Sequence, residues 1–268
     1  MISQVIDWLT DPANWTGADG IPNRLVEHVQ FSVITLLIAL VIAVPIGAWV
    51  GHTGRARWLV TSANAVRAVP SLGLLFAVSM LVGPLIKSSL AFVIPSIVVL
   101  VLLAIPPLLS GTYAGIESID PAARDAARGM GMTGSQVLWR VELPCALPLF
   151  LSGLRSATLQ VIATATIAAS VSLGGLGRFL IDGLANRDSQ QMIGGSLLVA
   201  VLALAVDGLL ALVQRYTVSP GLSGRSRHVA PRRGSARGGR VPSETLPTGL
   251  PLHEASASVG KVPEKDRP

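Results

Sequence analysis

The chain has 268 residues and a formal net charge of +6; 50% of its residues are hydrophobic and only 13% are charged. A soluble domain has about 25% charged residues, so this composition excludes a disordered chain or a coiled coil and predicts an all-α polytopic membrane protein. The single cysteine, Cys145, excludes an internal disulfide and a cysteine-based zinc site, and four scattered histidines predict no metal site.

The positive charge gathers at the C-terminus, where residues 221–268 hold nine Lys/Arg and four Asp/Glu. Runs of arginine can bind nucleic acid, but these residues include no aromatic side chain that could stack on a base. Proline and glycine are frequent there, which is typical of disorder. We therefore expect residues 218–268 to form a basic cytoplasmic tail beside anionic lipids, and we expect no nucleic-acid partner.

Five apolar segments are long enough to cross a bilayer as helices, which takes about 20 residues. Their bounds are 29–50, 58–86, 88–116, 147–173 and 192–213. Prolines inside them are expected to kink the helices or to open the hydrogen-bond ladder locally. These prolines are Pro45, Pro70, Pro95, Pro106 and Pro107.

Lys and Arg gather in alternate loops, and this asymmetry predicts the orientation in the membrane. The segment before the first span is acidic, whereas the loop after it and the loop over residues 117–144 are basic. We predict an outside N-terminus, an inside C-terminus, five spans and no cleaved signal peptide. The expected domains are an extracytoplasmic segment over 1–28, a membrane domain over 29–217 and the tail over 218–268.

The loop over 117–144 carries signals for two short helices joined by a glycine turn. Asp120 and Pro121 predict a helix start, and Gly129 with Gly131 predicts its end. Thr133 and Gln136 have the spacing of a capping box, which starts a second helix. That helix is expected to stop before Pro144, which favours an extended Leu143. The loop is thus predicted to be a rigid knob with a slim alanine face.

The same loop resembles the EAA loop of ABC importer permeases. The family pattern is Glu-Ala-Ala, three residues, Gly, nine residues, then Ile-x-Leu-Pro. This chain has Asp125-Ala126-Ala127, then Gly131, then Val141-Glu142-Leu143-Pro144 at the same spacing. Asp125 for Glu and Val141 for Ile are mild departures, and the other specified positions agree.

In that family the loop is a coupling helix that docks into a cleft of a separate ATP-binding subunit. The resemblance implies that Asp125, Ala126, Ala127 and Gly131 lie at this contact. It also implies that the Val141-x-Leu143-Pro144 end fixes the knob to the fourth span. The chain itself has no P-loop, so it is expected not to be an enzyme and to bind no cofactor, with ATP and Mg on the partner subunit.

The resemblance covers about residues 25–216 and implies the transmembrane domain of a type I ABC importer in the cytoplasmic membrane of a prokaryote. Two copies of the ATP-binding subunit are expected as partners, together with an extracytoplasmic substrate-binding protein. One five-helix protomer cannot enclose a central path, so a second permease is expected, either an identical copy or a paralogue. The lipid bilayer is the remaining partner.

Further motifs point to one branch of the family. Asn64-x-x-Arg67-x-x-Pro70-Ser71, the run over 120–132 and the Gly-Gly-Leu-Gly segment over 174–177 resemble osmoprotectant permeases, which import glycine betaine, carnitine or choline. Methionine permeases share the five-span layout, the Arg-x-x-Pro element and the glycine segment. Import of methionine or another amino acid is therefore the alternative.

Ionisable residues in apolar spans suggest a function. Arg67 and Asn64 are candidates for a gate, with Pro70 as a kink and Ser71 beside it, although Arg67 can also snorkel to the interface. Snorkelling is the expectation for Arg155 as well. Asp207 is about mid-span and is expected either to pair with a residue of a neighbouring subunit or to line the translocation path.

Two other classes of membrane protein fit the sequence less well. An integral membrane enzyme needs convergent titratable residues, and the spans offer only Arg67, Arg155 and Asp207. A self-sufficient channel or secondary transporter favours inverted repeats or discontinuous polar spans, and neither is visible in the sequence.

Overall fold

The computed structural model describes residues 2–88 and 90–218, so the predicted tail, except for residue 218, lies outside the described residues. The described residues form helices and connecting turns, without a strand, as predicted. The longer helices are α1 (Ile2–Thr10), α2 (Ile21–Thr53), α3 (Trp58–Ala65), α4 (Ser71–Val82), α5 (Val93–Glu117), α6 (Pro121–Gly129), α8 (Leu143–Ala168), α9 (Gly177–Asn186) and α10 (Ser189–Thr217). The short ones are η1 (Pro12–Trp15), η2 (Val66–Ala68), η3 (Gly83–Leu85), α7 (Gly134–Val137), η4 (Leu138–Glu142) and η5 (Ala169–Val171).

Helices occupy each of the five apolar segments. Four of them are continuous and apolar enough to cross a bilayer: α2, α5, the run Gly134–Val171 that contains α8, and α10. The predicted domain boundary at residue 29 falls inside α2, which begins eight residues earlier at Ile21. The segment after α2 is a broken span, in which Trp58–Ala68 and Ser71–Leu85 meet at 94°.

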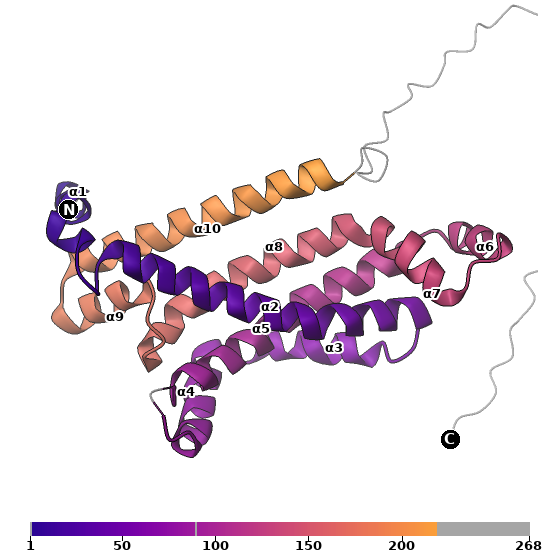
Figure 1. Ribbon diagram of the computed structural model, residues 1–268. Coiled ribbons are helices and arrows are strands. Elements are labelled where there is room, and N and C mark those ends of the chain that lie inside the picture. The colour runs from indigo at the N-terminus through magenta and orange to yellow at the C-terminus, as the bar shows by residue number, and fades with distance from the viewer. Residues whose placement is uncertain (1, 89, 219–268) are drawn as a thin grey trace, which may run out of the picture. The chain divides into compact units, whose positions relative to one another are not determined.

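Pro70 explains the break between α3 and α4. Its ring removes a backbone N–H donor and pushes the preceding residue out of the helical region. Val69 accordingly has an extended backbone, with φ −76° and ψ 129°. The predicted kink is therefore a complete interruption, and α4 turns away from the direction of α3 (Figure 1). By contrast, α2 continues through Pro45, and α5 through Pro106 and Pro107.

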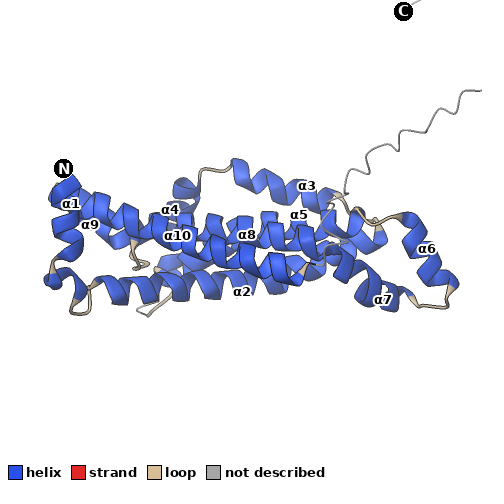
Figure 2. Ribbon diagram, turned by 90° about the horizontal axis from the view of Figure 1, so that it is seen from above, coloured by secondary structure: helices blue, strands red, loops and turns tan. Residues whose placement is uncertain are grey.

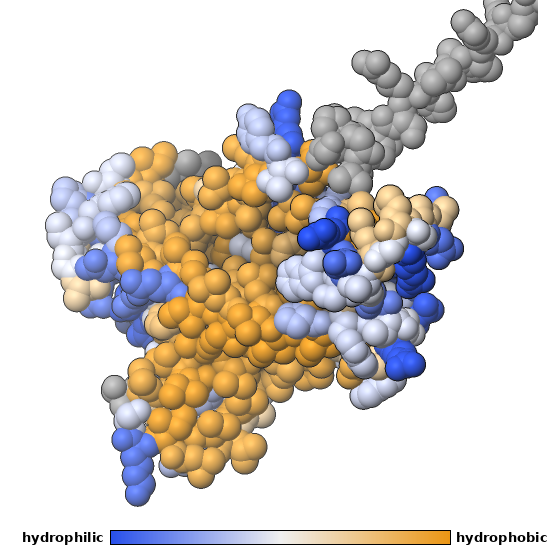
Figure 3. All heavy atoms as spheres, turned by 45° about the vertical axis from the view of Figure 1, so that its right-hand side comes forward, coloured by the Kyte–Doolittle hydropathy of each residue, from blue (hydrophilic) through white to orange (hydrophobic). Residues whose placement is uncertain are grey.

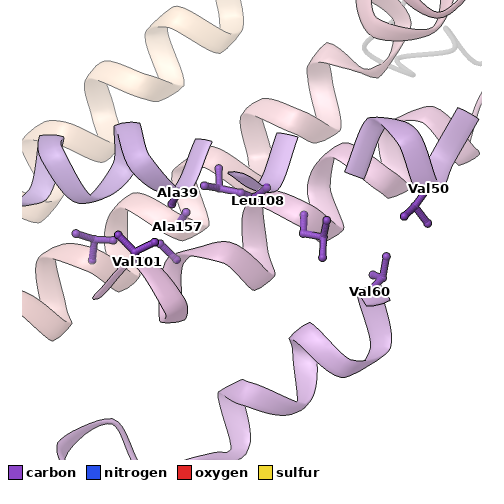
Figure 4. Packing of buried hydrophobic residues seen from close by; sticks show 10 residues of the cluster. Ala39, Val50, Val60, Val101, Leu108 and Ala157 are labelled. Atoms are coloured by element: carbon purple, nitrogen blue, oxygen red, sulfur yellow. The ribbon is translucent and has the colours of Figure 1, made fainter. Parts of the chain in front are cut away.

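α5 lies at the centre of the bundle, beside both α2 and α8 (Figures 1 and 2). Its core neighbours are small aliphatic residues, and Figure 4 shows Ala39 of α2 and Ala157 of α8 near Val101 and Leu108 of α5. Small residues let helix backbones approach closely in a membrane, where van der Waals packing replaces the hydrophobic effect. α5 thus packs against α2, α8 and both parts of the bent segment, whereas α10 packs on α8 and α9.

Gly153 of α8 is the closest of these approaches. A Cβ added there would lie 2.6 Å from the carbonyl oxygen of Pro107, and Gly111 of α5 faces the same point. A backbone carbonyl inside a helix cannot move aside without breaking that helix. The two helices can therefore keep their separation only with a glycine at this position.

The polar parts of the described chain lie at its two ends. α1 and α9 form one end of the bundle, while α6 and α7 project from the other (Figures 1 and 2). Between them the surface is a broad apolar belt (Figure 3). This distribution fits a protein whose middle contacts lipid or another apolar surface and whose ends contact water.

We expect Gly153→Ala to destabilise the bundle by about 1–3 kcal/mol, because the added methyl overpacks the α5–α8 contact. Thermal unfolding of the purified chain in detergent would measure the effect. Gly208→Ala in α10 is the matched control, since a Cβ there meets no atom within 4 Å. That control should be neutral or slightly stabilising; equal losses from the two variants would contradict the packing argument.

Candidate functional site

The projecting helix α6 begins as the sequence predicts. The Asp120 side chain accepts a hydrogen bond from Ala122 N at 2.9 Å, and Pro121 occupies the first turn. Asp125 and Ala126 are exposed, whereas Ala127 is buried against the rest of the chain. Of the predicted contact residues of α6, Asp125 and Ala126 are therefore available to a partner, whereas Ala127 packs against the rest of the chain.

The turn after α6 also follows the prediction. Gly131 has φ +83°, the left-handed conformation that a glycine adopts without strain. The Thr133 hydroxyl accepts from Gln136 N, while the Gln136 side chain accepts from Thr133 N at 2.9 Å, which completes the capping box. Both ends of the turn are thus fixed by local hydrogen bonds.

The end of this region differs from the prediction at Leu143. The chain does not extend before Pro144 but passes through one π-helical turn, η4, directly into α8. Leu143 is helical, with φ −62° and ψ −45°. Pro144 follows closely after this π-helical turn, and such turns are one of the places where a helix accommodates a proline or a bend. Leu143 packs against the buried cluster of Ala48, Ile116 and Ala146.

A buried carboxylate holds the projecting loop to the bundle. Glu142 is fully buried, at 0% exposure. One of its oxygens lies 2.9 Å from Nε of Arg124 in α6, and the other lies 2.7 Å from Nδ1 of His52 at the end of α2. Arg124 also donates to the carbonyl oxygen of Ile116 in α5. Four elements, α2, α5, α6 and η4, therefore meet at one carboxylate.

Sequence reasoning missed Glu142 and His52 as site residues. Glu142 occupies the unspecified position of Val141-x-Leu143-Pro144, and His52 lies 90 residues earlier in the chain. The available signal was a carboxylate directly before an apolar span, where an unpaired charge is costly. Val141 is half-buried beside it, and Pro144 is exposed.

The predicted gate residues separate into two groups. The Asn64 side chain donates to Ser110 Oγ of α5 at 3.0 Å. Arg67, Pro70 and Ser71 instead line a pocket of about 300 Å³ at the break between η2 and α4, together with Leu103 of α5 and Gln160 of α8. Neither Asn64 nor Asp207 is among the residues that line it.

Asp207 forms an ion pair with Arg155 instead. Nε and Nη2 of Arg155 donate to the two carboxylate oxygens at 2.9 and 2.8 Å, a bidentate geometry that joins α8 to α10. Arg155 was expected to snorkel to the membrane interface, but its side chain instead pairs with the carboxylate of Asp207 on the neighbouring helix. Gln214 of α10 reinforces this contact by donating to Pro148 O at 3.2 Å. Both charges are thus compensated within the chain.

At the opposite end of the bundle, the Gly-Gly-Leu-Gly segment over 174–177 begins with a glycine turn. Gly174 and Gly175 both have positive φ, at +88° and +75°. The Glu27 side chain of α2 accepts from Gly175 N at 2.9 Å and pairs with Arg24 at 2.8 Å. The turn is therefore fastened to the start of the first span.

Comparison with known proteins gives one matching family model and several relatives. The model, described as the binding-protein-dependent transport system inner membrane component, matches residues 29–219. The glycine betaine/carnitine/choline transport system permease protein OpuCB of Bacillus subtilis is 32% identical over 199 residues, which are 74% of this chain and 88% of that protein. The osmoprotectant import permease protein OsmW of Salmonella typhimurium is 32% identical over 200 residues, covering 73% and 91% of the two chains.

A solved structure confirms the fold. A chain of the inward-facing MetNI methionine ABC transporter superposes with a TM-score of 0.67 at 20% identity, covering 78% of this chain and 100% of that chain. At this identity the similarity concerns the fold alone. It confirms the predicted permease architecture of about five spans.

We expect Glu142→Gln to loosen α6, because Arg124 would keep its charge and lose its carboxylate. Breaking a buried pair on one side costs about 3–5 kcal/mol. Trypsin cleavage after Arg124 or Arg128 should accelerate severalfold, and the unfolding midpoint in detergent should fall. Asp125→Asn is the matched control, because its carboxylate is 76% exposed and lies 3.7 Å from Arg128. Equal cleavage rates in the two variants would show that Glu142 does not anchor α6.

The ion pair between α8 and α10 gives a separate prediction. Asp207→Asn should lower the unfolding midpoint in detergent, because Arg155 loses a charged hydrogen-bond partner. The exchange Arg155→Asp with Asp207→Arg should recover much of that loss. A midpoint that Asp207→Asn leaves unchanged would mean that the pair does not hold α10 in place.

Proposed function

Because the chain belongs to the family of binding-protein-dependent transport system inner membrane components, we propose that it forms the translocation path of an ABC importer for osmoprotectant quaternary amines. Family membership makes it a multi-pass permease of the plasma membrane. The names of OpuCB and OsmW support glycine betaine, carnitine and choline as the substrate class. They favour this class over the methionine alternative, since the methionine transporter resembles the chain in fold alone.

The observation that carries the proposal is the rigid, outward-facing α6 at one end of the bundle. Asp125 and Ala126 are exposed on it, while Ala127 and the Arg124–Glu142 pair fix its inner side. A helix whose outer face is exposed and whose inner face is held to the bundle can dock into another protein and transmit that protein's movement. The proposed partner is an ATP-binding subunit, two copies of which would bind ATP and Mg and carry out the hydrolysis.

The other proposed partners follow from surfaces that the chain leaves uncovered. The apolar window of α10 has no buried residue, and Leu204 and Leu209 are 73% and 61% exposed. The bent segment α3–α4 packs mainly on α5, and Met80 and Leu81 of α4 remain 77% and 75% exposed. These surfaces fit lipid and a second permease, identical or paralogous, with the path between the two copies. A substrate-binding protein would deliver substrate at the end formed by α1 and α9.

Uptake of labelled glycine betaine tests this function. Cells would carry the ATP-binding subunit and the binding protein of the same system, with this chain either absent or restored. We expect the native chain to restore uptake, and unlabelled choline or carnitine to compete more strongly than methionine.

Gly131→Ala tests the coupling loop in the same assay. A side chain at φ +83° strains the turn after α6, at a cost of about 1–2 kcal/mol, so α6 should tilt and uptake should fall severalfold. Gly208→Ala is the control, because both positions have open space for a Cβ and only Gly131 has a positive φ. No uptake with the native chain would contradict the proposed transport, while native uptake that Gly131→Ala leaves unchanged would contradict the role of the loop.

A further inference from the structure

We propose that the pocket at the break of the second span binds the carboxylate of zwitterionic substrates through Arg67, so that the permease itself distinguishes betaines from choline. This inference rests on the proposed function and adds a substrate site within the permease. The pocket has a volume of about 300 Å³ and is lined by residues of η2, α4, α5 and α8. That volume is at the small end of ligand pockets and suits a molecule of the size of glycine betaine.

The charge of the pocket favours an anionic group. Its lining includes Arg67 and no carboxylate, and its remaining polar side chains are Ser71 and Gln160. Gln160 Nε2 donates to Thr164 at 3.2 Å, which leaves its carbonyl oxygen available. The planar guanidinium of arginine matches a carboxylate with two parallel hydrogen bonds. The pocket therefore offers the guanidinium group of Arg67 beside the polar side chains of Ser71 and Gln160.

Within residues 2–88 and 90–218, Arg67 has no ion-pair partner. Arg155, in contrast, is neutralised by Asp207. Arg67 lies nine residues after Trp58, which places it about 14 Å along the helix axis from the start of α3. Arg67 is exposed in the described chain, so a ligand can reach it. A charge within an apolar span is costly where it faces lipid, which favours contact with water, a partner or a ligand. The ligand carboxylate supplies the missing anion.

The lining residues also indicate which part of the substrate is recognised. Trimethylammonium groups are typically held by aromatic rings, and none of the residues that line this pocket is aromatic. The quaternary head is common to glycine betaine, carnitine and choline, whereas only the first two have a carboxylate. A site that binds the carboxylate should therefore bind choline more weakly than glycine betaine or carnitine. Its affinity must be low, because a transport path has to release what it binds.

Equilibrium binding to the assembled complex without its substrate-binding protein tests this site. The purified permease–ATPase complex, with the full chain, would be titrated with glycine betaine or choline and followed by saturation-transfer NMR. We expect millimolar binding of glycine betaine and at least about tenfold weaker binding of choline, as lost hydrogen bonds to a charged group imply. Arg67→Gln should weaken the binding of glycine betaine to the affinity measured for choline. Arg67→Lys should recover part of the lost affinity.

Arg57→Gln is the matched control, because Arg57 is 64% exposed and pairs only distantly, at 3.4 Å, with Glu117. It should bind glycine betaine as the native complex does. Equal binding of glycine betaine and choline, binding that Arg67→Gln leaves unchanged, or no binding to the native complex would each overturn the proposal. The uptake assay above is independent of this titration, so a failure of the proposed function would appear there as absent uptake by the native chain.

Discussion

The arrangement of the α6 end depends on the burial of one carboxylate. Removing a carboxylate from water costs several kcal/mol unless charged or polar partners replace the water. Glu142 has two such partners, Arg124 and His52, which come from helices on either side of it. α6 itself buries only Ala127, too little apolar surface to fix its position. The polar cluster therefore determines where α6 lies, and the apolar packing of the spans determines where the cluster lies.

The ionisable residues of the spans fall into two kinds. Arg155 and Asp207 neutralise each other and join two helices, so their pairing accounts for both charges without a ligand. Arg67 lies on a broken helix, beside a pocket, and has no such partner in the part of the chain that the structure describes. An unpaired charge in an apolar span persists only where it has a use. The pair thus has a structural role, whereas the unpaired Arg67 is the residue on which the proposed substrate contact rests.

Local signals predicted local structure well. The cap at Asp120, the left-handed Gly131 and the capping box at Thr133 depend on residues no more than four positions apart, and all three are confirmed. His52, one partner of Glu142, and Asp207, the partner of Arg155, lie 90 and 52 residues away, so only the packing of the spans could reveal them. The prediction of an extended Leu143 was wrong because the sequence alone does not distinguish a proline near the start of a helix from a proline that follows the end of one.

Helix α5 connects the two sites that these charges define. Its C-terminal end accepts the Arg124 bond at Ile116, and Leu103, thirteen residues earlier, lines the Arg67 pocket. These positions are about 20 Å apart along one helix. Ser110 lies between them and holds Asn64 of α3. α5 thus connects the anchor of α6 to the pocket through one helix that is packed closely on α8. The break at Val69 and Pro70 is the place where the neighbouring span can change direction.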